Sequence, residues 1–260
     1  MAMRSFFDQL GNSLSCQFPP QRIVSLVPSQ TELLADLGLQ KEVVGITKFC
    51  VHPKEWLKSK TLVGGTKNFN LETIDSLSPD LIIGNKEENY RDGVEQLKAK
   101  YPVWVSDIVT LQDALSMIIS MGELTDRNTT AQKISNGILQ AFDQIKRYSN
   151  QSVLYLIWKK PWMAAGSGTF IHSLLNTIGL RNAVENISRY PELTPNEIQK
   201  VKADYIFLSS EPYPFQEKHI AELLEISPSS KIKRVDGEMF SWYGSRLLKA
   251  PDYFNRLMLD

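Results

Sequence analysis

The chain has 260 residues, 42% of them hydrophobic and 22% charged, which suits one large globular domain or two lobes with a sizeable core. The 29 Lys and Arg residues balance the 29 Asp and Glu residues, so the net charge is zero. Nucleic-acid-binding domains usually carry a basic excess or a basic stripe, and the sequence has neither. We therefore expect no nucleic-acid partner.

The N-terminal sequence MAMRSFFDQLGNSLSCQFPPQR does not fit a signal peptide, because Asp8, Gly11 and Asn12 interrupt the continuous apolar run that such a peptide needs. No stretch reaches the roughly 18–20 apolar residues of a membrane helix. The sequence alone predicts a soluble chain without an export signal, which leaves a cytoplasmic location open. Cys16 and Cys50 are too few for a disulfide framework, and we expect two free thiols.

Strands and helices alternate in the first part of the chain. A β-branched run at 22–27 predicts a buried strand, and Ser29 then caps a helix, with Glu32 at capping-box spacing and Gly38 as its stop. Further strands are expected at 43–46, 81–83 and 103–105, and further helices at 71–77 and 94–100. This alternation predicts βαβ units and a largely parallel sheet.

Two successive helices follow, at 111–124 and from about 125 to 148. In the second, apolar residues recur at intervals of three and four and define one helical face; they are Ala131, Ile134, Ile138, Phe142 and Ile145. With a rise of 1.5 Å per residue, ~22 residues span roughly 33 Å, enough to cross a domain. The helix is therefore either an ordinary core helix or a rigid connector between two lobes.

The α/β alternation begins again after Asn150, with strands at 152–158, 203–208 and 231–235 and helices at 170–178, 220–224 and 251–259. One unit recurs: NLETIDSLSPDLIIG (70–84) is answered by PNEIQKVKADYIFLS (195–209), each an amphipathic stretch that leads into a buried strand. We predict an N-terminal α/β lobe (1–110), connecting helices that include a long backbone helix (111–149) and a C-terminal α/β lobe (150–260). Ligands tend to bind in the cleft that such lobes form.

Three segments carry a resemblance to a known family. They are DQLGNSLSCQFPPQRIVSLVPSQTELLADLGL (8–39), VGGTKNFNLETIDSLSPDLIIG (63–84) and the long helix after Thr125. Together they resemble the helical-backbone metal receptors, which are substrate-binding proteins of ATP-binding-cassette (ABC) importers for cobalamin, haem and iron–siderophore chelates. The resemblance implies two similar α/β lobes with mainly parallel sheets joined by one long helix, as in class III periplasmic binding proteins.

The resemblance also implies a function, which is to bind a metal chelate and deliver it to an ABC permease dimer. The chelate would be cobalamin, another corrinoid or a ferric siderophore. Glu72 and Glu197 match the glutamates that dock on permease arginines, although the helix dipole also favours a carboxylate in a first turn. The chelate is cargo, so we expect no cofactor, no catalytic residue, no protein-held metal and a monomeric chain. The family implies a periplasmic or other extracytoplasmic location.

Loops at the carboxyl ends of strands are expected to line the cleft. Aromatic side chains there suit a flat macrocycle, cations suit carboxylates or phosphate, Glu87 suits amide donors, and His52 suits an axial metal position. The alternative for each is loop packing or a solvated charge, but the loop MFSWYGSR would be costly to expose without a ligand. The residues selected are Phe49, His52, Lys86, Glu87, Trp158, Trp162, Tyr190, Phe240, Trp242, Tyr243 and Arg246.

The sequence departs from the family pattern in two places. Thr66 stands where an aromatic residue would follow Gly65, and residues 85–89 lack a tryptophan, so the ligand is expected to differ from that of the B12-binding members. The rival hypothesis is a cytosolic tetrapyrrole chelatase that uses His52 with Glu87 or Glu88, or a corrinoid chaperone. The sequence contains no phosphate-binding GxxxxGK[ST] loop, no strand-associated GxGxxG and no GxSxG motif, and we expect no enzyme.

Overall fold

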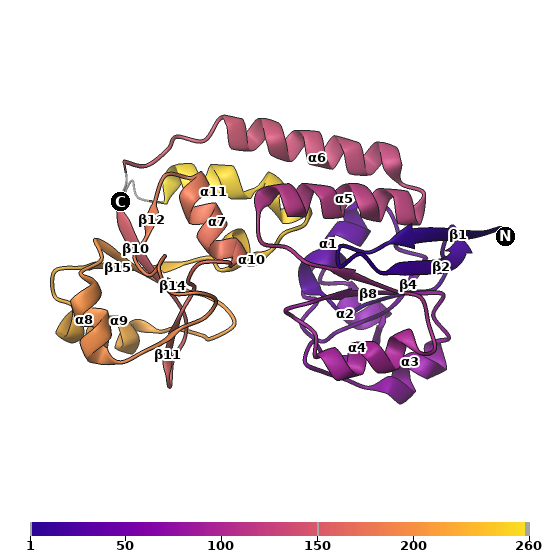
Figure 1. Ribbon diagram of the computed structural model, residues 1–260, viewed down its shortest axis with the longest axis horizontal. Helices are drawn as coiled ribbons and strands as arrows, with labels where there is room; N and C mark the ends of the chain where they lie inside the picture. Colours follow the sequence, from indigo (N-terminus) through magenta and orange to yellow (C-terminus); the bar gives the residue numbers. More distant parts are fainter. Residues whose placement is uncertain (1, 150, 258–260) are drawn as a thin grey trace. The chain divides into compact units, whose positions relative to one another are not determined.

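The computed structural model describes residues 2–149 and 151–257 (Figure 1). The chain divides into two compact units. Unit 1 comprises the residues up to Ile108, Gln112–Gln140 and Tyr243–Leu248. Unit 2 comprises Val109–Leu111, Ala141–Trp242 and the residues from Lys249 onward. Each unit is built around its own sheet.

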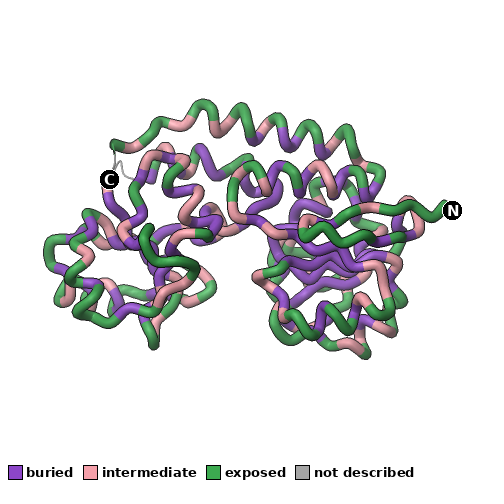
Figure 2. The backbone as a smooth tube through the Cα atoms, viewed as in Figure 1, coloured by how far each residue is buried: buried purple, intermediate pink, exposed green. Residues whose placement is uncertain are grey.

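The sheet of unit 1 has five strands, all parallel, in the order β5-β4-β3-β8-β9. Every residue of β8 and β9 is buried, as expected for apolar, β-branched strands that are covered on both faces (Figure 2). The parallel sheet predicted from the alternation of strands and helices is therefore present. The strands are β3 (Ile23–Ser25), β4 (Val43–Ile46), β5 (Thr61–Leu62), β8 (Leu81–Asn85) and β9 (Val103–Ser106).

Helices cover both faces of this sheet. Ile74 of α3 and Leu97 of α4 pack in one cluster with Val24 and Ile82 of the strands, while α5 lies on the other side (Figure 1). The helices of this part of the chain are α1 (Pro28–Asp36), α2 (Trp56–Ser59), α3 (Leu71–Leu77), α4 (Arg91–Lys98), α5 (Leu111–Thr125) and α6 (Asn128–Asp143).

The helix predicted to run to Tyr148 is shorter than expected. It is α6, which has 16 residues and ends at Asp143, so it spans about 24 Å rather than 33 Å. Beyond it, the Tyr148 N–H donates to the Ile178 carbonyl at 2.8 Å. The backbone after Asp143 thus bonds within unit 2 instead of continuing the helical ladder. The apolar periodicity outlasts the helix because Ile145 is still partly buried.

An antiparallel hairpin precedes the first predicted strand, and its turn holds the Asp8-x-x-Gly11 sequence for which the family resemblance implies a hairpin. It pairs β1 (Ala2–Phe7) with β2 (Ser13–Phe18), and Gly11 in its turn has φ +81°, a value that favours glycine. Leu14 and Cys16 are buried while Ser13 and Ser15 are exposed, so the strand alternates with period two. That alternation is a further sequence signal for the second strand of the hairpin.

The sheet of unit 2 has the order β13-β11-β10-β14-β15, with β12 also paired to β10. Strands β10, β12, β14 and β15 run parallel, and β11 and β13 add an antiparallel edge. Ile198 of α8 and Leu223 of α9 pack in one cluster with Leu154 and Leu208 of the strands. The elements are β10 (Ser152–Trp158), β11 (Trp162–Ala164), β12 (Arg181–Asn182), β13 (Glu192–Leu193), β14 (Tyr205–Ser209), β15 (Lys231–Val235), α7 (Phe170–Thr177), α8 (Pro195–Val201), α9 (Glu217–Ile226), α10 (Glu238–Ser241) and α11 (Ala250–Arg256).

The repeated unit of the sequence forms α3 and β8 in unit 1 and α8 and β14 in unit 2. Each short helix ends at a residue with left-handed backbone, with φ of +44° and +48°. An aspartate before each strand then bonds the chain that leads into the neighbouring strand. The Asp80 carboxylate accepts the Arg22 N–H at 2.8 Å, and the Asp204 carboxylate accepts the Ser152 N–H at 2.7 Å. The repeat seen in the sequence is therefore also present in the structure.

Candidate ligand-binding site

The carboxyl ends of the five parallel strands of unit 1 lie along one edge of its sheet, which we call the carboxyl edge. Strand order reverses at β3, because β4 lies on one side of it and β8 on the other. Open α/β sheets bind ligands outside the carboxyl ends of the strands at such a point. The segments there are residues 26–27 with the first turn of α1, the loop 47–53 after β4 and the turn 86–89 after β8; residues 64–68 lie between β5 and α3.

The loop that follows β4 carries two of the predicted ligand residues, Phe49 and His52. Phe49 is 50% exposed, and Lys48 Nζ lies 5.2 Å from the centroid of its ring. His52 is half-buried. An exposed aromatic ring beside an ammonium group offers apolar contact area together with positive charge. This loop is therefore suited to a ligand that combines a flat apolar body with acidic groups.

A buried polar layer lies beneath the same loop. The hydroxyl oxygens of Thr31 and Thr47 lie 3.1 Å and 3.2 Å from Cys50 Sγ, and all three residues are fully buried. Burial raises the pKa of the Cys50 thiol, so the thiol stays protonated at neutral pH. Cys16 and Cys50 are both free, as the sequence predicted. Cys50 therefore belongs to the scaffold of the loop.

A tight turn after β8 positions Lys86 and Glu87. The Asn85 side-chain oxygen accepts the Glu87 N–H at 2.8 Å, and the Asn89 side-chain oxygen accepts the Asn85 N–H, also at 2.8 Å. Lys86 Nζ pairs with Asp107 Oδ2 at 2.6 Å, but its side chain is 56% exposed. An exposed ion pair contributes little stability, so an acidic ligand can compete for Lys86 at small cost.

Tyr243 and Arg246 belong to unit 1, in the segment that contains the 3₁₀ helix η1 (Ser245–Leu248), and both are buried. The Arg246 guanidinium contacts the Glu32 carboxylate of α1 at 2.9 Å through both Nε and Nη2. The Tyr243 hydroxyl donates to the Glu88 carboxylate. The expectation that these two residues lie exposed for a ligand is therefore wrong. They attach the segment to α1 and to the loop after β8.

The aromatic residues predicted around β10 and β11 differ in accessibility. Trp158 is 40% exposed and packs edge-on against Tyr213, with 5.4 Å between ring centroids. Tyr190 is half-buried. Trp162, by contrast, is 6% exposed and stacks on Phe215 inside the hydrophobic cluster of unit 2. Trp158 and Tyr190 thus keep ring area for a ligand, whereas the expectation for Trp162 is corrected to core packing.

Phe240 and Trp242 are also buried, against expectation. Phe240 has no exposed surface, and its ring centroid lies 4.8 Å from that of Phe254 and 5.0 Å from that of Tyr155. The Trp242 Nε1–H donates to Glu211 Oε1 at 2.9 Å. Desolvation raises the pKa of Glu211, although this bond to its ionised form opposes the shift. The segment MFSWYGSR, expected to be an exposed loop, instead forms part of α10 and the start of η1, and its aromatic side chains are buried.

The two predicted docking glutamates lie exposed in the first turns of α3 and α8. Glu197 forms a capping box, in which its carboxylate accepts the Thr194 N–H at 2.7 Å, and this bond lowers the pKa of Glu197. In α3 the cap is Asn70, whose side chain accepts the Thr73 N–H at 2.8 Å. The Glu72 carboxylate is therefore not used as a helix cap.

Sequence reasoning missed several residues that hold the predicted site residues in place. Glu32 was expected to complete a capping box with Ser29, but α1 has no side-chain cap and Glu32 pairs with a residue 214 positions later. Glu211 and Tyr213, which contact Trp242 and Trp158, were not singled out. No local pattern could have found the Glu32 contact, since its partner is so distant in the sequence. The loop position of Tyr213 after a strand was a usable signal.

Within residues 2–149 and 151–257, no three His, Cys, Asp or Glu side chains are grouped so that they could hold a metal ion. In that same part of the chain, no helix combines the length and the apolar character needed to cross a bilayer.

The two α/β units, with their mainly parallel sheets, the repeated helix–strand element and the intervening helices, define the fold of class III periplasmic binding proteins. The chain belongs to the periplasmic binding protein family, whose model matches residues 23–229. The family predicted from the sequence is thereby confirmed. Its members bind and carry ligands and do not catalyse reactions, so the rival enzyme hypothesis is set aside and any chelate is cargo rather than cofactor.

Relatives by sequence and by structure agree with this family. Over 211 residues the chain is 28% identical to the uncharacterized ABC transporter substrate-binding lipoprotein YvrC of Bacillus subtilis, covering 76% of this chain and 67% of that protein. It is 24% identical over 197 residues to a vitamin B12-binding protein of Vibrio parahaemolyticus, covering 74% and 71%. The structure of the periplasmic heme-binding protein HutB of Vibrio cholerae matches with a TM-score of 0.78 at 22% identity, over 92% of this chain and 99% of that chain. This likeness confirms the predicted fold.

Proposed function

We propose that the protein is the substrate-binding component of an ABC importer for cobalamin, another corrinoid or a ferric siderophore. The observation that carries the proposal is the exposure of two aromatic rings: Phe49, 50% exposed in the loop after the parallel strand β4, and Trp158, 40% exposed at the carboxyl end of the parallel strand β10. Exposed rings at such positions lose water-accessible apolar area when a flat chelate covers them. Relatives named for vitamin B12, heme and ABC transport support the same ligand class.

Polar groups of the strand-end loops suit the periphery of a chelate. Lys48 and Lys86 provide ammonium groups for carboxylates or phosphate, Glu87 accepts amide donors, and Tyr190 adds a half-buried ring in unit 2. The half-buried imidazole of His52 is the one histidine in these loops that suits an axial metal position. We include all five in the proposed ligand-binding set with Phe49 and Trp158.

A titration tests this proposal. Intrinsic tryptophan fluorescence is followed during addition of cyanocobalamin, cobinamide, heme or a ferric hydroxamate siderophore. We expect saturable quenching at micromolar or lower concentration by one of them. Phe49→Ala and Trp158→Ala should each weaken the affinity about tenfold, since a large aromatic contact is removed. Leu224→Ala, which truncates a 46% exposed apolar residue of α9, is the control and should bind normally. Absence of saturable quenching with every probe would contradict the ligand class.

Docking on a permease is the second part of the proposal. Glu72 and Glu197 lie exposed in corresponding first turns of the repeated unit, so each unit presents one carboxylate suited to an arginine of one permease subunit. The double variant Glu72→Lys, Glu197→Lys should abolish uptake of the bound chelate and leave its affinity unchanged. Normal uptake by that variant would remove the docking role. The proposal includes a monomeric state, which sedimentation can test. It also includes a location outside the cytoplasm, which cell fractionation can test.

A further inference from the structure

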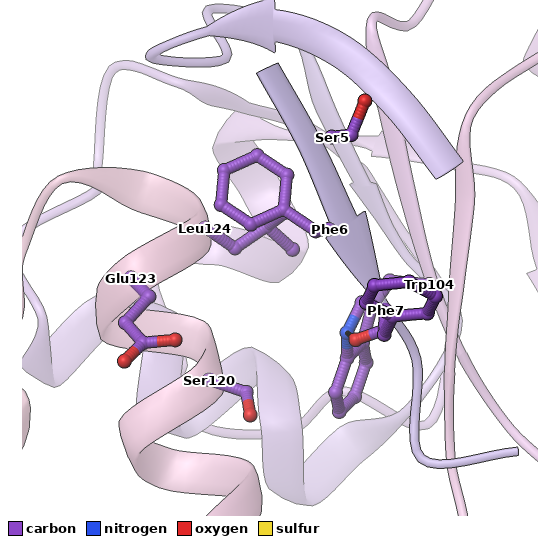
Figure 3. Close-up of a pocket in the computed structure, with 7 residues that line it drawn as sticks. All are labelled: Ser5, Phe6, Phe7, Trp104, Ser120, Glu123 and Leu124. Carbon is purple, nitrogen blue, oxygen red and sulfur yellow. Dashed lines mark hydrogen bonds between the residues drawn. The ribbon is translucent and has the colours of Figure 1, made fainter. Parts of the chain in front are cut away.

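A cavity of about 300 Å³ lies within unit 1 (Figure 3). Its walls come from three elements: Phe6 and Phe7 from β1, Trp104 from β9, and Ser120, Glu123 and Leu124 from α5. None of these residues takes part in the ligand-binding set or in the proposed docking on a permease. The cavity is thus a second site, and its role does not depend on the proposed function. Its volume is at the lower end for ligand pockets, so it fits a small molecule.

The aromatic walls of the cavity are fixed in part and open in part. Trp104 is only 1% exposed, and its Nε1–H donates to the Phe7 carbonyl at 3.1 Å, so the hairpin strand and the indole are held together. The Phe7 side chain, by contrast, is 72% exposed. An exposed phenylalanine at the mouth of a cavity gains from any ligand that covers it. The Trp104 indole thus forms a wall fixed by a hydrogen bond, and the Phe7 ring forms a wall that is exposed to solvent.

The charge at the cavity is negative. Glu123 is exposed, and Figure 3 shows its carboxylate across the space from the Trp104 and Phe7 side chains, with the Ser120 hydroxyl below it. Among the described residues, no lysine, arginine or histidine forms an ion pair with Glu123. An anion at this place would be repelled by the carboxylate, and a neutral apolar guest would cover the charge without compensating it. A cationic guest is attracted by both the carboxylate and the aromatic rings.

We propose that this cavity binds a small organic ammonium ion. The cationic head lies between the Glu123 carboxylate and the aromatic walls, and apolar substituents on the nitrogen contact Phe6, Phe7 and Leu124. The Ser120 hydroxyl accepts a hydrogen bond when the head carries an N–H. Combined recognition by aromatic rings and a carboxylate distinguishes alkylated ammonium ions from metal ions, which need several oxygen ligands, and from anions.

The experiment uses the full chain labelled with ¹⁵N and observes the indole N–H signal of Trp104, assigned by its loss in Trp104→Phe. Choline is the cationic probe, and 3,3-dimethylbutan-1-ol is its uncharged counterpart of the same shape. We expect the signal to move saturably with choline, and the uncharged probe to bind at least about threefold more weakly. Glu123→Gln keeps the shape of the side chain and should weaken choline by a similar factor, whereas Glu55→Gln, an exposed glutamate of unit 1 outside the cavity, should not.

A second variant addresses the exposed wall. Phe7→Ala alters a side chain that is mostly in water, so the fold should be retained, and choline should bind about threefold more weakly because contact area is lost. Three results would overturn the proposal: no saturable movement of the Trp104 signal with choline, equal binding of the uncharged probe, or unchanged choline binding by Glu123→Gln. A cyanocobalamin or siderophore titration that fails leaves this test unaffected, because the two sites share no residue.

Discussion

The two units build the start of their sheets in the same way but complete the carboxyl ends differently. In unit 1, Asp80 precedes β8 and accepts a hydrogen bond from the Arg22 N–H, just before β3. In unit 2, Asp204 precedes β14 and accepts one from the N–H of Ser152, the first residue of β10. In unit 1 the far end is held by a segment from late in the chain, through Arg246. In unit 2 the ring of Phe240 packs instead against Tyr155 of β10 and Phe254 of α11. The shared aspartate hydrogen bonds help to define the fold of both units, and the different packing at the carboxyl ends determines which side chains of each unit a ligand can contact.

The largest expected effect separates the two units at Arg246. Replacing Arg246 by Met leaves the Glu32 carboxylate buried without its guanidinium, which should destabilise the chain by about 3–5 kcal/mol. Amide hydrogen exchange resolves the effect by region: exchange should rise in β3 and β8 of unit 1 and stay unchanged in β10 and β14 of unit 2. Equal loss of protection in both sheets would show that the segment supports more than unit 1.

A matched variant controls for the loss of an arginine. Arg127→Met breaks the partly exposed pair of Arg127 with Glu42, whose closest atoms are 3.4 Å apart, and should cost less than about 1 kcal/mol. The double variant Arg246→Met, Glu32→Leu removes both buried charges and should recover much of the lost stability. If the double variant were as unstable as Arg246→Met alone, the unpaired charge would not be the cause.

A smaller effect tests whether the aspartate hydrogen bonds contribute equally to the stability of the two units. Asp80→Ala and Asp204→Ala each remove a carboxylate that accepts two backbone or side-chain donors, and each should lower the free energy of unfolding by about 1–2 kcal/mol. Denaturant unfolding of both variants, with Asp92→Ala in the first turn of α4 as the control, gives the comparison. A loss confined to one variant would show that the repeat is shared in sequence but not in energy.

The smallest effect concerns the two first-turn glutamates. Glu197→Gln weakens a capping box, whereas Glu72→Gln removes no cap, so only the former should lower the melting temperature, by no more than about 2 °C. Hydrogen bonding lowers the folded-state pKa of Glu197 below its unfolded value. Its contribution is therefore present above the unfolded pKa and is lost as the pH falls through the folded pKa. Calorimetry at pH 7 and pH 3 should show a smaller difference between the variants at the lower pH.

Much of the fold follows from patterns that are local in the sequence. The apolar runs at 81–83 and 205–208 predict buried parallel strands, since strands covered on both faces are apolar on both. The end of α6 was misplaced because apolar periodicity measures burial rather than helicity. Tyr148 remains half-buried after the helix has ended, and its backbone bonds to Ile178 instead.

The candidate site was less predictable because exposure depends on distant packing. Phe49 lies in the loop after β4, Trp158 is the last residue of β10, and both are exposed, as expected. Trp162 and Phe240 occupy similar loops in the sequence but meet Phe215 and Phe254, so they become core. An aromatic residue in a loop has the same local sequence signature in both cases, and only the partners decide which occurs.

The placement of Tyr243–Leu248 in unit 1 has a consequence for how the chain is made. Translation delivers the strands β3, β4, β8 and β9 early, but the arginine that faces Glu32 is synthesised only near the end, after almost all of unit 2. Unit 1 therefore cannot reach its final stability on the ribosome while unit 2 is still emerging. The nascent protein completes its first-made lobe last, and a fragment that stops before Tyr243 lacks the Arg246–Glu32 ion pair.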